Sequence, residues 1–127
     1  MANKKYRDVL NDGYLQYGKK ETQLSPRGKR IGEKFVPIGR LAYQEMSCRD
    51  EDYAFAQSAS SALSMKVRTL YPPNLRNVAK NTLKIIVKGT EYDVIKADSD
   101  RSKAYLFFML QEVGTYEQNK AKDESTD

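Results

Sequence analysis

The last third of the chain has the clearest alternation of apolar and polar residues. Residues 83–88 form a short apolar run, and residues 91–97 alternate after it. Between them, Gly89-Thr90 has a glycine in first position, which predicts a two-residue type II′ hairpin turn. Residues 104–113 are aromatic-rich and apolar on both faces, which favours a buried strand. These patterns predict three consecutive antiparallel strands.

Three more strands are expected earlier in the chain. Residues 63–71 alternate regularly, as a half-buried strand does, and residues 14–24 alternate in part. Residues 33–46 supply a further strand, which Pro37 and Gly39 interrupt, so we expect an edge position or a β-bulge there. From the best-defined strands, the expected core residues are Val67, Ile85, Val87, Val94, Phe107 and Met109.

One short helix is expected between these strands. Ser47 stands three residues before Asp50, the first of three acidic residues, which predicts an N-cap at Ser47 and a helix start behind it. The serine-rich residues 58–64 are poor helix formers, so the helix should end near Ala62.

The predicted fold class is mainly β, a small barrel of five to six antiparallel strands with one short inserted helix. Barrel closure is the economical solution for short strands, because it removes free strand edges. The chain of 127 residues has the length of one domain. We assign residues 1–113 to this domain and expect the polar residues 114–127 to be a disordered tail.

Composition limits the chemistry. The absence of His removes the commonest general base and most zinc sites, and a single Cys leaves neither a disulfide nor a metal cluster. We therefore expect a binding or assembly protein of a reducing compartment, neither an enzyme nor dependent on a cofactor. No apolar run approaches the roughly 20 residues of a membrane span. Residues 1–6 have no apolar segment behind their lysines, so we do not expect them to be a secretory signal.

Positive charge is concentrated in the first third of the chain. The formal net charge is +5, and residues 19–34 alone carry six basic and two acidic side chains. Their two glycines and one proline predict a long, mobile hairpin tip or loop. Such a basic loop suits a polyanion or an acidic protein surface, and a solvated loop without contacts fits it equally well. The candidate contact residues are Lys19, Lys20, Arg27, Lys29 and Arg30.

Other candidate sites are weaker. Asp93, Asp98 and Asp100 could hold a divalent ion in a nuclease-like site, but turns select Asp for its backbone hydrogen bonds. Residues 26–30, with the sequence PRGKR, are similar to a minor-groove arm, although a single such segment does not indicate specific reading of duplex DNA. Cys48 has no neighbouring His to activate it and is expected to be a small buried hydrophobe.

The order of these features resembles the head–tail joining family of long-tailed bacteriophages, the head-closure proteins of the head–tail connector. The matching segments are DGYLQYG at 12–18, EDYAFA at 51–56 and MKVR at 65–68. They are followed by LKI ahead of a glycine and YDVI within 83–95, and by the strand from YL to LQEV at 105–113. The order and spacing of these segments carry the resemblance.

The resemblance implies a structural virion protein of the head–tail interface, assembled in the host cytoplasm. Copies would form a ring beneath the portal and its adaptor, close the DNA-filled head and offer a docking surface to a tail terminator or another tail protein. The packaged DNA would be contacted nonspecifically, and no membrane would be involved. Two alternatives stay open, a small β-barrel nucleic-acid-binding module and a metal-dependent nuclease that uses the aspartate cluster.

Overall fold

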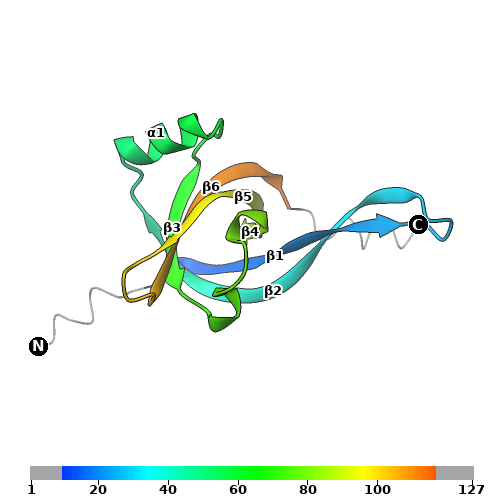
Figure 1. The fold of residues 1–127 in the computed structure, drawn as a ribbon, viewed down its shortest axis with the longest axis horizontal. Coiled ribbons are helices and arrows are strands. Elements are labelled where there is room, and N and C mark those ends of the chain that lie inside the picture. The colour runs from blue at the N-terminus through cyan, green and yellow to red at the C-terminus, as the bar shows by residue number, and fades with distance from the viewer. Residues whose placement is uncertain (1–9, 117–127) are drawn as a thin grey trace, which may run out of the picture.

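The computed structural model describes residues 10–116, which form a closed antiparallel β-barrel with one helix and one long projecting hairpin (Figure 1). The helix α1 (Asp50–Ser58) joins the second strand to the third. Two 3₁₀ helices, η2 (Pro73–Leu75) and η3 (Lys80–Thr82), lie between the third and fourth strands. The strands are β1 (Gly13–Leu24), β2 (Arg30–Met46), β3 (Met65–Leu70), β4 (Lys84–Val87), β5 (Thr90–Ser99) and β6 (Tyr105–Thr115).

Closure of the barrel confirms the predicted fold class. The strands follow one another around the barrel in the order β1-β2-β3-β6-β5-β4, and β4 pairs with β1 to complete the circle. Every pair is antiparallel. The one crossover, from β3 to β4, is made by the polar connection of residues 72–82, whose Leu75 is fully buried. Within residues 10–116, no helix is long and apolar enough to cross a membrane.

Inward-facing side chains of all six strands fill the barrel. Four of the expected core residues, Val67, Ile85, Val87 and Val94, belong to this cluster. Thr69 is buried among them, and its hydroxyl donates to the carbonyl of Leu70 at 2.9 Å. The other members of the cluster are Leu15, Tyr17, Tyr43, Leu75, Leu83, Tyr92, Leu106, Phe108 and Leu110.

The predicted inward face of the last strand is wrong. Phe108 is fully buried in the barrel, whereas Phe107 is only half-buried and faces outward. Met109 is buried, but it lies beside Phe107 on the outer side, in a pocket near α1. The register between β3 and β6 determines which side chains of β6 face inward, because Phe108 pairs with the inward-facing Val67 of β3.

Two local predictions also need correction. The hairpin turn between β4 and β5 is Lys88-Gly89 rather than Gly89-Thr90, since Val87 pairs with Thr90. Both turn residues have positive φ, 50° and 80°, which is the pattern of a type I′ turn. The helix cap is Arg49 rather than Ser47, and the backbone N–H of Arg49 donates to the Asp52 carboxylate at 2.9 Å.

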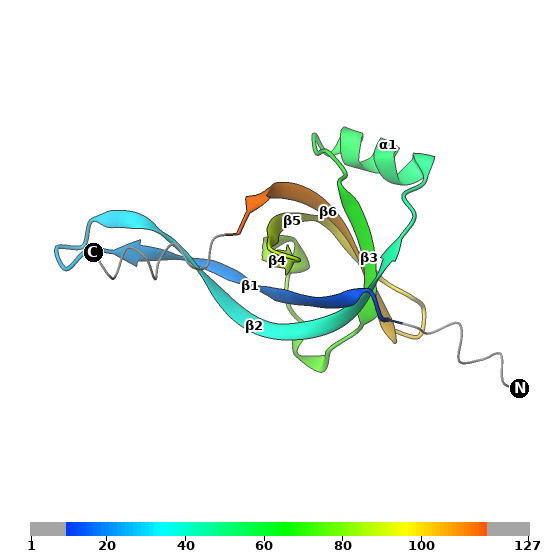
Figure 2. The same cartoon turned by 180° about the vertical axis from the view of Figure 1, so that it is seen from behind.

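The basic segment predicted as a mobile hairpin tip or loop is the outer part of a β-hairpin, and its regular strand pairing extends further than expected. β1 pairs with β4 only over residues 15–18, and β2 pairs with β3 only over residues 43–46. Beyond these points, β1 and β2 continue together as a two-stranded ribbon away from the barrel (Figures 1 and 2). Only residues 25–29 form its turn.

The chain stays ordered past the predicted domain boundary at residue 113. β6 runs to Thr115, and the N–H of Tyr116 donates to the carbonyl of Gly89 at 2.7 Å. The rest of the predicted disordered tail, residues 117–127, lies outside the described residues.

Candidate functional site: a projecting basic arm

The candidate site is the outer part of the β1–β2 hairpin, residues 19–34, called the arm from here on. It leaves the barrel at a β-bulge, where Tyr17 pairs with Gly39 and Gly18 pairs with Pro37, so that Ile38 is the extra residue. This bulge confirms the interruption expected at Pro37 and Gly39. A bulge bends a strand and increases its twist, which directs the arm outward.

Glycine is required where the two strands cross at this bulge. A methyl group at Gly18 would overlap the Val36 carbonyl oxygen and lie 2.9 Å from the Phe35 ring. A methyl group at Gly39 would lie 2.5–2.9 Å from the Tyr17 ring and hydroxyl. The close approach of these backbones and rings sets the direction in which the arm departs.

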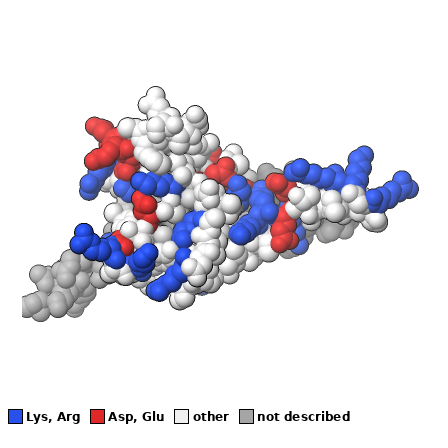
Figure 3. Space-filling view, viewed as in Figure 1, with Lys and Arg blue, Asp and Glu red and all other residues white. Residues whose placement is uncertain are grey.

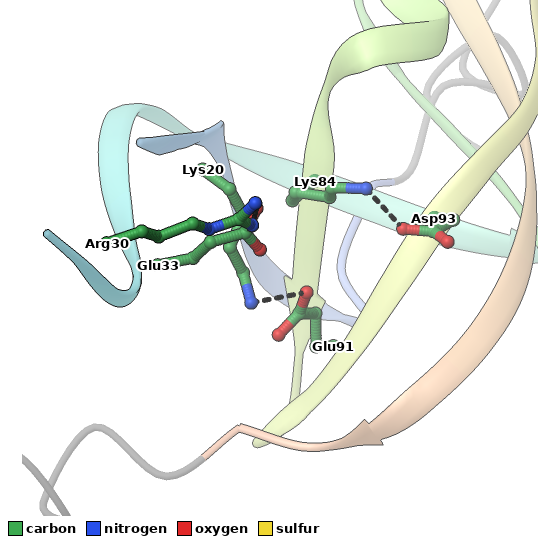
Figure 4. A network of polar contacts seen from close by, with 6 residues as sticks. All are labelled: Lys20, Arg30, Glu33, Lys84, Glu91 and Asp93. Atoms are coloured by element: carbon green, nitrogen blue, oxygen red, sulfur yellow. Dashed lines mark hydrogen bonds and ion pairs between the residues drawn. The ribbon is translucent and has the colours of Figure 1, made fainter. Parts of the chain in front are cut away.

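The root of the arm is anchored to the barrel by apolar and ionic contacts. The buried Phe35 packs edge-to-face on Tyr116, with ring centroids 5.6 Å apart. On the same side, the Lys20 ammonium pairs with Glu91 at 3.2 Å, and Glu91 is only 8% exposed (Figure 4). Lys20 thus serves the attachment of the arm, because it neutralises a nearly buried carboxylate.

The tip of the arm is an ordered turn. The Ser25 hydroxyl accepts hydrogen bonds from the N–H groups of Arg27 and Lys29, at 3.3 and 3.1 Å. The Ser25 N–H donates to the Lys29 carbonyl at 2.7 Å, and Gly28 takes a φ of +83° that few other residues adopt. The turn therefore presents Arg27 and Lys29 from a defined backbone.

The arm carries an excess of cations that face solvent (Figure 3). Arg30 pairs with Glu33 at 3.2 Å, but both side chains are largely exposed, so the pair contributes little stability. In residues 10–116, no carboxylate lies within ion-pair distance of the remaining four cations. These are Lys19, Arg27, Lys29 and Lys34.

The structure therefore brings the five predicted contact residues onto one element but divides their roles. Lys20 and Arg30 are paired within the chain, and Lys19, Arg27 and Lys29 are available for a partner. Sequence reasoning missed Lys34 and two exposed apolar side chains beside the turn, Leu24 (60% exposed) and Ile31 (65% exposed). Two large apolar residues flanking a short polar turn were the signal that could have identified them.

The aspartates considered for a metal site have separate partners. Asp93 pairs with Lys84 at 2.7 Å (Figure 4), and Asp98 pairs with Lys96 at 3.1 Å. Asp100 accepts from the N–H groups of Ala104 and Tyr105, and its hydrogen bonds to Tyr105 and Ser102 hold its pKa below the usual 3.8. In the described part of the chain, no three His, Cys, Asp or Glu side chains are grouped as a metal site requires.

Comparison with known proteins identifies the fold. No protein-family model and no curated protein matches this sequence. Among solved structures, the chain is similar to protein SF1141 from Shigella flexneri 2a, with a TM-score of 0.58 and 11% identity over 80% of this chain and 92% of that one. It is also similar to a chain of the virion of a native gene transfer agent particle, with a TM-score of 0.50 and 12% identity over 82% and 96%.

The fold is shared with a virion chain. At 11% and 12% identity, both similarities concern the fold alone. The virion similarity extends over nearly the whole of that chain, so the shared unit is the complete barrel rather than a fragment of it.

Proposed function

We propose that this protein is a structural component of a phage-like virion. Copies assemble as a ring between the portal or its adaptor and the tail, close the DNA-filled head and provide the surface on which the tail docks. In this proposal the protein has no catalytic role. The observation that carries it is the basic arm projecting from a closed barrel. The fold shared with a virion chain and the resemblance to head–tail joining proteins support it.

The arm suits contact with a polyanion or an acidic protein surface. At the usual rise of a β-strand, residues 19–24 extend about 20 Å. The arm therefore carries two of its unpaired cations, Arg27 and Lys29, well away from the barrel in the turn at its tip, while Lys19 and Lys34 lie at its root. Basic side chains extend along the arm to its far end (Figure 3). In a ring, such arms reach either the DNA in the channel or a neighbouring subunit, and both contacts are favoured by opposite charge.

The test replaces the three available predicted cations, Lys19, Arg27 and Lys29, with serine in the particle-producing host. Lys20 and Arg30 stay, because they pair within the chain. We expect an unchanged far-UV circular dichroism spectrum, together with DNA-filled heads that lack tails or leak DNA in electron micrographs. Particles with normal infectivity or gene-transfer activity would contradict the proposed role of the arm.

A charge-matched control removes three exposed cations from other loops. Lys88→Asn, Arg101→Ser and Lys103→Asn lower the net charge equally, and asparagine tolerates the positive φ of the two lysines. The control variant should give normal particles. Mass spectrometry of purified wild-type particles must also detect the protein, and its absence from them would refute the virion assignment itself.

The unpaired arm cations also favour a second candidate function, a monomeric nucleic-acid-binding module. Four phosphate contacts would give a slope of about −3.6 for log affinity against log salt on duplex DNA. A module of this kind binds tightly as a monomer, whereas the proposed ring component binds DNA weakly until assembled. DNA titrations of the isolated protein at two salt concentrations distinguish the two functions.

A further inference from the structure

A second surface of the molecule lies beside α1, on the outer face of the barrel. An open pocket of about 180 Å³ is formed there between the helix and strands β3, β5 and β6. Phe107 and Met109 of β6 supply its apolar lining. The polar lining residues are Asp52, Lys66, Lys96 and Asp98.

The charges around this pocket neutralise one another. Asp52 pairs with Lys66 at 3.0 Å, and Asp98 pairs with Lys96 at 3.1 Å. The N–H of Arg49 and the ammonium of Lys66 hold the pKa of Asp52 below its usual 3.8, so this carboxylate stays ionised at neutral pH. With its charges paired, the pocket offers apolar contact to whatever enters it.

The size of the pocket suits one aliphatic side chain. An apolar cavity of about 150 Å³ accommodates a benzene molecule, so about 180 Å³ accommodates a leucine or isoleucine side chain. The apolar surface continues on α1 at Phe55, which is 39% exposed and whose ring centroid lies 4.5 Å from the ammonium of the pocket residue Lys96.

The arm tip has the matching properties. Ile31 and Leu24 expose aliphatic side chains next to the cations Arg27 and Lys29. The first turn of α1, whose Asp52 lines the pocket, also exposes Asp50 and Glu51, and the last turn has no basic residue. Acidic side chains gather at one end of the helix (Figure 3). Apolar and charged groups therefore correspond on the two surfaces.

The two surfaces belong to different sides of the molecule. In both views the arm extends away from the barrel, and α1 lies over the barrel, far from the arm tip (Figures 1 and 2). One copy cannot join its own tip to its own pocket in this conformation. A contact between them must join two copies, and a head-to-tail contact of this kind builds a ring or an open chain.

We propose that the arm tip of one copy docks beside α1 of the next copy, with Ile31 in the pocket and Arg27 and Lys29 facing Asp50 and Glu51. This contact rests on the proposed function, because it names the partner of the arm as a second copy of the chain. It is small, so its affinity is low for two free copies and increases when neighbouring copies are held in place by a larger assembly.

Charge reversal tests the contact with full-length protein. The arm variant carries Arg27→Glu and Lys29→Glu, and the helix variant carries Asp50→Lys and Glu51→Lys. Wild-type protein should self-associate at millimolar concentration in low salt, as measured by sedimentation equilibrium. Each variant alone should associate at least about tenfold more weakly, because its docking surfaces then carry like charges.

An equimolar mixture of the two variants should restore association. In the mixture, every acidic arm meets a basic helix and every basic arm meets an acidic helix. Variants that associate alone as wild type does, or a mixture that stays monomeric, would overturn the proposal. Both variants change only exposed residues, and unchanged thermal unfolding of each confirms that the fold is retained.

The apolar half of the contact has its own control. Ile31→Ser should weaken self-association roughly fivefold or more, as expected for a side chain that fills an interface pocket. Ile38→Ser, at an exposed position on the same strand near the barrel, should leave it unchanged. Equal effects of the two substitutions would refute docking of Ile31.

The two proposals fail separately. If the mixture restores association but purified particles lack the protein, the contact stands and the virion role fails. If particles contain the protein but neither variant affects association, the virion role stands and the contact fails.

Discussion

Truncation of Phe108 tests the inward face of β6 and thereby the register of the barrel. Its side chain is 0% exposed and belongs to the central cluster, so Phe108→Ala removes a complete buried ring. Such truncations lower the free energy of unfolding by about 3–5 kcal/mol. For a domain of this size, that corresponds to a decrease in melting temperature of roughly 11–22 °C.

The neighbouring phenylalanine is a matched control. Phe107 is half-buried at an open pocket, so Phe107→Ala leaves no closed cavity and should cost only about 1 kcal/mol. Urea unfolding of both variants, followed by far-UV circular dichroism because the chain has no Trp, compares their midpoints at an unchanged slope. A Phe107→Ala variant as destabilised as Phe108→Ala would show that the inward face has been assigned incorrectly.

Three further predictions concern the arm root, the α1 anchor and the free protein. Gly18→Ala places a methyl group against the Val36 carbonyl and should lower unfolding stability by about 1–3 kcal/mol in urea titrations, whereas wild-type stability would exclude this crossing. Because the folded-state pKa of Asp52 is lowered, its contribution is present above pH 3.8 and is lost as the pH falls through the folded value. Asp52→Asn should therefore reduce the acid dependence of the melting temperature, and an unchanged acid profile would argue against the contacts of Asp52 with the Arg49 N–H and with Lys66. The isolated protein should sediment as a monomer at micromolar concentration, and a stable ring under those conditions would contradict the weak contact.

Local sequence patterns were sufficient to identify most of the elements of this fold. Period-two alternation is a property of the strand itself, so the strands around Val67, Ile85 and Val94 could be recognised without knowing their partners. The acidic first turn likewise indicated the helix, and the break at Pro37 indicated the bulge. The concentration of positive charge in residues 19–34 also identified the candidate site.

Tertiary contacts decided what these patterns left open. Residues 104–113 are apolar on both faces, so alternation could not show whether Phe107 or Phe108 faces the core. The pairing of Phe108 with Val67 in β3 and the extra residue Ile95 in β5 determine that Phe108 faces inward. The polar arm was predicted as a mobile hairpin tip or loop, because a two-stranded ribbon has too little apolar surface to be stable alone. It is ordered by residues distant in sequence, through the packing of Phe35 on Tyr116 and the pairing of Lys20 with Glu91. Local periodicity reports which residues share a face, and only long-range packing determines which face is buried and which polar segments are held in place.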